Sequence, residues 1–139
     1  MNELPNIEVV DNDYFGIFAN KHYSEDFLYR LCNKFDAQRK KILEFFQLSE
    51  YSKVRINLFD NINQLNAFSS KYINISTYHK GDCCGNMINY FCDDESLKDN
   101  FKTGYIIASI AHEFVHMVYH EAIHGVDCVW LEEGLAVYL

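Results

Sequence analysis

The sequence of 139 residues is long enough for one ordinary domain and too short for two separate hydrophobic cores. Apolar residues make up 49% of the chain and charged residues 23%, which excludes a mainly disordered protein. The formal charge of −8 argues against nucleic acid and anionic membranes as partners, because binding to either needs a basic surface.

Neither a membrane span nor a signal peptide is expected. No stretch approaches the roughly 20 apolar residues that a span needs. Residues 1–15 carry acidic side chains where a signal peptide needs a basic patch and then an apolar stretch. If this N-terminus is native, the chain is expected in the cytoplasm. The cysteines are expected to be reduced thiols: Cys32, Cys83, Cys84, Cys92 and Cys128.

The first half of the chain predicts one long helix between two strands. Residues 1–12 are polar and are expected to form a loose or edge segment, and residues 14–19 a short strand. From the N-cap candidate Ser24 to about Leu48, apolar residues recur with a helical period. Residues 53–59 alternate and predict a half-buried strand, with Val54, Ile56 and Leu58 inward and Arg55 and Asn57 outward.

The second half predicts two short strands followed by helices. A short helix capped by Asp60 or Asn61 precedes a strand at 72–78, a turn at 79–86 and a strand at 87–92. A long helix is expected from Ser96, in a pattern resembling a capping box, to Gly125. Residues 130–139 predict a last helix. The fold class is therefore α+β, one domain over residues 1–139, with a small sheet covered by helices.

The long predicted helix contains the sequence HExxH, made by His112, Glu113 and His116. Residues four apart lie on one face of a helix, so both imidazoles can reach one tetrahedral zinc ion. Glu113 is rotated by about 100° from His112, which places its carboxylate beside the metal's open position rather than on the metal. That position suits a general base for the water that the metal activates.

A purely structural interpretation of these histidines stays open. His112, His116, His120 and His124 form a ladder of residues four apart, which is also typical of a solvated or packed helix face. The chain would then be a helical-core protein without metal, and Glu113 a surface carboxylate. His120 and His124 lie one and two turns beyond the HExxH pair and are expected to have no metal role.

The source of a third protein ligand distinguishes the classes of zinc enzyme. A metzincin pattern fails, because Tyr119 and Ala122 occupy the positions of its glycine and third ligand. Asp127 is a candidate of the aspartate-using type, although the usual Gly-Thr sequence is missing. Residues 130–136 read WLEEGLA, which resembles the W-L-x-E-G-x-A segment of gluzincin metallopeptidases, such as aminopeptidase-N-like and peptidase MA families. The resemblance implies that Glu133 completes the zinc site.

The resemblance also implies a zincin-like fold, a small mixed sheet with an edge strand packed on the HExxH helix. The strand before that helix is the gluzincin edge strand, where an extended peptide adds by main-chain pairing. The residues that would line the cleft are Asn86, Met87, Ile88, Asn89 and Tyr90. The alternative is that this segment is simply an interior strand.

The chain departs from the gluzincin pattern near its end. Val137 stands where some gluzincins have an aspartate that orients a zinc histidine. The sequence ends six residues after Glu133, without the usual helical subdomain, so we expect the natural chain to continue. The uncovered last helix favours self-association. Candidate oxyanion donors are Tyr119, His120 and Tyr138.

Together these features predict a zinc-dependent metallopeptidase that acts on a peptide or protein substrate. Zinc is expected on His112, His116 and Glu133, with Glu113 as the general base. The alternative, from a different functional class, is a zinc-binding or interaction module whose peptidase site is incomplete and does not catalyse hydrolysis.

Overall fold

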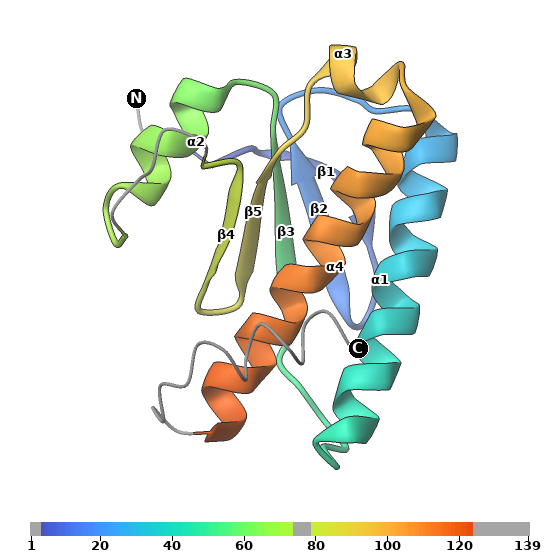
Figure 1. The fold of residues 1–139 in the computed structure, drawn as a ribbon, viewed down its shortest axis with the longest axis vertical. Coiled ribbons are helices and arrows are strands. Elements are labelled where there is room, and N and C mark those ends of the chain that lie inside the picture. The colour runs from blue at the N-terminus through green and yellow to red at the C-terminus, as the bar shows by residue number, and fades with distance from the viewer. Residues whose placement is uncertain (1–3, 74–78, 124–139) are drawn as a thin grey trace.

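A five-stranded mixed sheet with two long helices on one face forms the described part of the protein (Figure 1). The computed structural model describes residues 4–73 and 79–123. In chain order the elements are β1 (Ile7–Asp11), β2 (Phe15–Ala19), α1 (Glu25–Phe45), β3 (Val54–Phe59), α2 (Ile62–Ser69), β4 (Gly81–Cys84), β5 (Met87–Phe91), α3 (Asp94–Leu97) and α4 (Asn100–Ile123). The α+β class expected from the sequence is confirmed.

The strand order is β1-β2-β3-β5-β4. The three central strands, β2, β3 and β5, are parallel, and the two outer strands each pair antiparallel with their neighbour. The prediction that residues 86–91 form an edge strand is therefore wrong. β5 hydrogen-bonds β3 on one side and β4 on the other, so β4 lies at that edge of the described sheet.

The segment 79–86, predicted as a turn, contains β4 because pairing with β5 overrides its local turn preference. Within the hairpin the turn is short, and Gly85 adopts the left-handed φ of 58° that favours glycine. The strand predicted from residue 72 is not seen at Tyr72 and Ile73, which lie in a turn and a bend after α2, and residues 74–78 lie outside the described part. At the other edge, the prediction of an edge segment in residues 1–12 is confirmed by β1.

The two faces of the sheet carry two separate apolar clusters. Val54, Ile56 and Leu58 of β3 face α1 and α4 and belong to the main core, as predicted. The opposite face packs under α2 around Phe59, Leu65 and Phe68. Asn57 was expected to point to solvent, but it is fully buried because α2 and the chain after it cover this face. Its amide donates to Asn89 Oδ1 at 2.8 Å, which satisfies the buried group.

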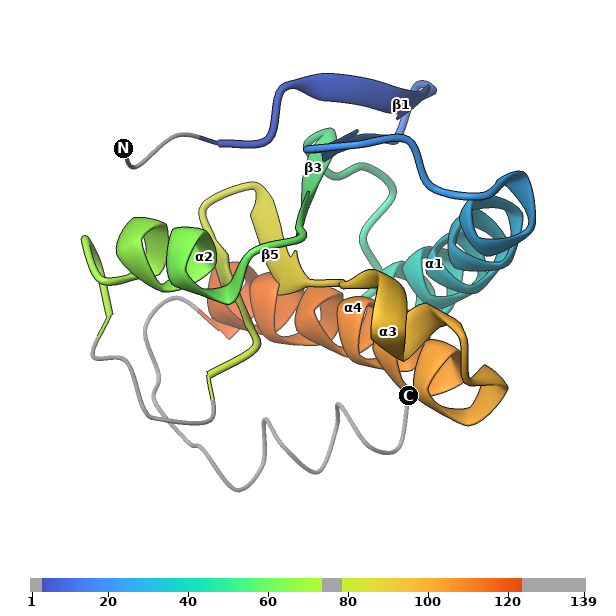
Figure 2. The ribbon, with the colours of Figure 1, turned by 90° about the horizontal axis from the view of Figure 1, so that it is seen from above.

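The long helices α1 and α4 lie side by side against the sheet (Figure 2). The predicted N-cap of α1 is confirmed, since Ser24 Oγ accepts from the Phe27 amide at 3.2 Å. Phe35 of α1 contacts Phe114 of α4 edge-to-face, with ring centroids 5.2 Å apart. The contact fixes the rotation of α4 about its axis, and with it the direction of the HExxH side chains.

The helix expected from Ser96 to Gly125 is two helices. Asp93 caps α3, its carboxylate accepting from the Ser96 amide at 3.1 Å. The Asp99 carboxylate accepts from the Phe101 and Lys102 amides at 2.8 and 3.2 Å, so a new helix begins at Asn100. Two caps close together break the predicted helix at its start. The predicted C-terminus at Gly125 and the helix at 130–139 lie outside the described residues.

Candidate metal centre and catalytic site

Helix α4 carries the HExxH residues on the side opposite its core face. Residues spaced at three and four along the helix are buried against the sheet and α1: Ile106, Ile107, Ile110, Ala111, Phe114, Val115 and Val118. His112, Glu113 and His116 are only half-buried. The burial of one face therefore leaves these three side chains accessible from outside the core.

The two histidines point their Nε2 atoms at one another. The Nε2 atoms of His112 and His116 lie 3.0 Å apart, and the ring centroids 4.8 Å. Two nitrogens bound to one tetrahedral zinc at about 2.0–2.1 Å lie about 3.4 Å apart, so the observed separation fits a shared ion after a small rotation of the rings. The same separation also allows one ring to donate a hydrogen bond to the other. Imidazole nitrogens are among the donors that zinc accepts, and these two supply at most two of the four positions of a tetrahedral site.

A third ligand is not present in the described residues. Residues 4–73 and 79–123 contain no group of three or more histidine, cysteine, aspartate or glutamate side chains placed to hold a metal ion. The sequence-based candidates Glu133 and Asp127 lie outside the described part of the chain. The assignment of Glu133 as the third zinc ligand therefore stays a prediction.

Glu113 and His112 line a pocket of about 420 Å³ between α4 and the start of β4. The other walls are Lys80, Gly81, Tyr90, Tyr105 and Ser109. A carboxylate and an imidazole thus reach one solvent-accessible space from adjacent positions of one helix. This is the arrangement expected for a base beside a metal-binding histidine.

Tyr90, one of the five residues predicted to line the substrate cleft, forms one wall of this pocket. Its ring lies against Gly81 of β4, where an added Cβ would stand 2.1 Å from the ring carbon Cδ2. Burial raises the pKa of the Tyr90 hydroxyl, and Tyr105 and Glu113 add to the rise, while a hydrogen bond with Ser109 lowers it. The phenol is therefore neutral at physiological pH and can donate a hydrogen bond. Pairing of Gly81 with Tyr90 produces this arrangement, and the sequence does not show that register.

The predicted substrate strand is only partly at the site. The main chain of β5 is paired on both sides, so no peptide can add to residues 87–90. Ile88 and Asn89 are buried, and Asn86 and Met87 do not line the pocket of Glu113. Of the five predicted cleft residues, only Tyr90 lines the pocket of Glu113. The unpaired edge next to α4, in the described sheet, belongs to β4.

The candidate oxyanion donors are not at the pocket. Tyr119 is 1% exposed and is not among the residues that line it. His120 is exposed and lines a separate hollow of about 490 Å³ with Tyr51, Cys83 and Glu121. Tyr138 lies outside the described residues. The phenols that line the pocket of the candidate base in the described residues are those of Tyr90 and Tyr105.

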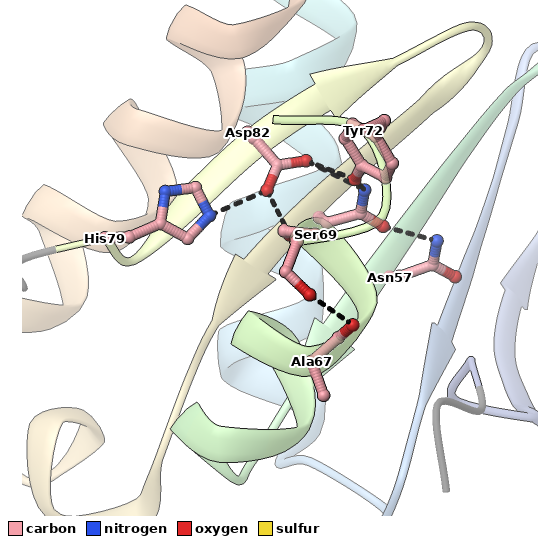
Figure 3. A network of polar contacts seen from close by, with 8 residues as sticks. Asn57, Ala67, Ser69, Tyr72, His79 and Asp82 are labelled. Atoms are coloured by element: carbon pink, nitrogen blue, oxygen red, sulfur yellow. Dashed lines mark hydrogen bonds and ion pairs between the residues drawn. The ribbon is translucent and has the colours of Figure 1, made fainter. Parts of the chain in front are cut away.

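A buried polar network holds β4 from the face opposite the pocket (Figure 3). Asp82 is 8% exposed, and its carboxylate accepts from Ser69 Oγ, from the Tyr72 hydroxyl at 2.7 Å and from Asn89 Nδ2 at 3.1 Å. His79 Nε2 lies 2.8 Å from the same carboxylate. These contacts tie β4 to β5 and to the segment after α2, so they fix the strand that borders the site.

No model of a known protein family matches the chain, and searches of curated proteins and of solved structures found no match either. Among the helices of the described residues, none combines the length and the apolar character needed to cross a bilayer.

Proposed function

We propose that the protein is a zinc-dependent metallopeptidase of the gluzincin type, with a zincin-like fold. One observation carries the proposal: the Nε2 atoms of His112 and His116 converge to 3.0 Å while Glu113 opens into the adjoining pocket. His112, His116 and Glu133 would hold the zinc ion. The resemblance of WLEEGLA to the gluzincin segment supplies the third ligand.

The chemistry is the addition of water to a peptide carbonyl. A bound zinc ion lowers the pKa of water towards about 7 and polarises the carbonyl group. Glu113, beside the histidines and open to solvent, accepts the proton as the water attacks. It then donates that proton to the leaving amine, since one carboxylate can act first as base and then as acid.

The Tyr90 hydroxyl and the edge of β4 would position the substrate. Because the phenol stays protonated, it can donate a hydrogen bond to a carbonyl oxygen in the pocket. In the part of the sheet that the structure describes, the outer edge of β4 runs beside α4 and would offer main-chain groups to an extended peptide. The substrate-binding strand of the proposal is therefore β4, with Tyr90 of β5 as a wall.

The test compares peptide hydrolysis by the zinc-reconstituted wild type with that by Glu113→Gln and Glu121→Gln. Glu113→Gln keeps the side-chain shape and removes the proton acceptor, so zinc content should stay near wild type while hydrolysis falls by roughly 100-fold or more. Glu121 is exposed on the same helix and lines the separate hollow, so its variant should keep full activity.

Zinc bound without hydrolysis of any peptide in a random library would favour the alternative, a zinc-binding module that does not turn over. Hydrolysis that survives in Glu113→Gln would show that another group is the base.

A further inference from the structure

The pocket of Glu113 continues into a second hollow of about 340 Å³ towards the N-terminal end of α4. Both are lined by Lys80, Tyr90 and Tyr105, so the two hollows adjoin at these side chains, and together they are named the groove. Phe91, Phe101 and Lys102 complete the far end. This groove extends away from the histidines along one side of the helix.

The groove follows a single stripe of α4. Phe101, Tyr105, Ser109 and Glu113 are four residues apart and therefore share a face. With a rise of about 1.5 Å per residue, Tyr105 lies about 10 Å from His112 along the helix axis. An extended peptide covers that distance in about three residues, at about 3.3 Å each. A residue three positions from a bond at the histidines would thus reach Tyr105.

The far end of the groove is lined by two exposed aromatic rings and two lysine side chains. Phe101 is 84% exposed and Tyr105 is 64% exposed, an unusual amount for two aromatic rings one turn apart. Lys80 and Lys102 flank them, in a chain whose formal charge is −8. No ion pair involves either ammonium group in the described part of the chain. The pKa of the Asp93 carboxyl is lowered, mainly by its hydrogen bond with Ser96 and slightly by the positive charge of Lys80.

We propose that this end of the groove is a substrate subsite for a large apolar side chain next to a carboxylate, about three residues from the bond that is cleaved. The inference rests on the proposed peptidase function. The aromatic rings of Phe101 and Tyr105 cover the apolar side chain, and the ammonium groups of Lys80 and Lys102 attract the carboxylate. The carboxylate belongs to an acidic side chain or to the C-terminus of the peptide, two sources with the same chemistry.

The subsite is tested by binding rather than by turnover. The probes are fluorescein-labelled, C-terminally amidated hexapeptides that differ only in one pair of adjacent residues. This pair is Phe-Glu, Phe-Gln, Phe-Lys or Ala-Glu. Fluorescence anisotropy with the full chain carrying Glu113→Gln measures affinity without cleavage. The Phe-Glu peptide should bind about fivefold more tightly than the Phe-Gln peptide. The Phe-Lys and Ala-Glu peptides should each bind more weakly than the Phe-Gln peptide. A Phe-Gln peptide with a free C-terminal carboxylate shows which source of the carboxylate is preferred.

Matched charge variants locate the effect. Lys102→Glu should remove the preference for Phe-Glu over Phe-Gln, and Tyr105→Ala should reduce the difference between Phe-Glu and Ala-Glu. Lys34→Glu changes the net charge equally on exposed α1 and should keep both preferences. Raising the salt to 0.5 M should weaken the carboxylate preference, because exposed charges are screened.

Equal affinity for Phe-Glu and Phe-Gln, or a preference that survives Lys102→Glu, would overturn the subsite. Absence of binding by every peptide would overturn it as well. Failure of the proposed function gives a different result, in which the preference is present but the wild type with zinc cleaves none of the peptides.

Discussion

The Nε2 atoms of His112 and His116 lie 3.0 Å apart on α4. Their direction depends on the packing of the residue between them, because the Phe114 ring contacts Phe35 and Tyr51 edge-to-face, with centroids 5.2 and 5.5 Å away. With Phe114 fixed in the core, the two histidines can point only away from it. The same packing that holds the helix therefore also orients the candidate zinc ligands.

The two adjacent glutamates of the WLEEGLA segment should differ in their effect on zinc affinity. In the helix predicted for residues 130–139, neighbouring side chains would point about 100° apart, so only one of Glu132 and Glu133 would face the metal. Glu133→Gln should weaken zinc binding by more than the roughly 10–100-fold that is typical of losing an outer partner. Glu132→Gln is the matched control and should bind zinc like the wild type. Competition with a fluorescent zinc chelator measures both, and the opposite order would reject Glu133 as the ligand.

Two glycine-to-alanine changes should have opposite effects on stability. At Gly81 a Cβ would meet the Tyr90 ring at 2.1 Å and the Asn89 carbonyl oxygen at 3.1 Å, so Gly81→Ala should cost about 1–3 kcal/mol. At Gly104, inside α4, the nearest atom is Nη2 of Arg30 at 4.0 Å. Gly104→Ala should therefore stabilise the protein by about 0.5–1 kcal/mol. Urea denaturation measures both, and a neutral Gly81→Ala would show that Tyr90 does not occupy the space above β4.

The carboxylate of Asp82 should be important for stability. This buried carboxylate accepts hydrogen bonds from Ser69, Tyr72 and Asn89. An amide in its place would turn an NH₂ donor towards these donors, so at least one of them would lose its acceptor. Asp82→Asn should lower the free energy of unfolding by about 2–3 kcal/mol. Asp94→Asn removes a carboxylate from an exposed pair with Lys21 and should change stability by less than about 1 kcal/mol. Equal effects of the two variants would contradict the buried network.

Stability should fall at alkaline pH because of Cys92. Burial raises the pKa of its thiol from 9.0 to about 12, with a smaller contribution from Asp93 and Asp94 and an opposing one from Tyr23 and Lys21. Below pH 9 the thiol is protonated in both states, so its contribution to stability is fully present. Between pH 9 and about 12 the thiolate forms only in the unfolded chain, which costs up to about 1.4 kcal/mol per pH unit.

Cys92→Ala should have a flatter dependence of unfolding free energy on pH above 9 than the wild type. The comparison of slopes removes the contribution of tyrosines that titrate in the same range. Identical slopes in the two proteins would mean that the Cys92 thiol ionises as readily in the folded chain as in the unfolded one.

Features that depend on neighbours along the chain could be predicted from the sequence. The helical period predicted α1 with its cap Ser24, because the period follows from the 3.6-residue turn. The pairing of His112 with His116 belongs to the same class, since residues four apart meet on any helix. The break before α4 could not be predicted as readily, because Asp93 and Asp99 each compete to begin a helix.

Features that depend on partners distant in the sequence could not be predicted. The order β3-β5-β4 places a GDCC segment at the edge, although its composition is typical of a turn. The burial of Asn57 needs Asn89, which lies 32 residues later on a neighbouring strand. Tyr90 was expected at the site as part of an edge strand, but it lies there because the register of an interior strand sets it opposite Gly81. None of these pairings leaves a periodic signal in one sequence.

The zinc content of the purified protein tests the central claim most directly. Elemental analysis after reconstitution with zinc and removal of excess metal should give about one zinc ion per chain in the wild type. His112→Ala and His116→Ala should each reduce it to a small fraction, while His120→Ala, one turn further along α4, should leave it unchanged. Zinc well below one equivalent in the wild type, or retained in full by both histidine variants, would contradict the assignment of this helix as a metal site.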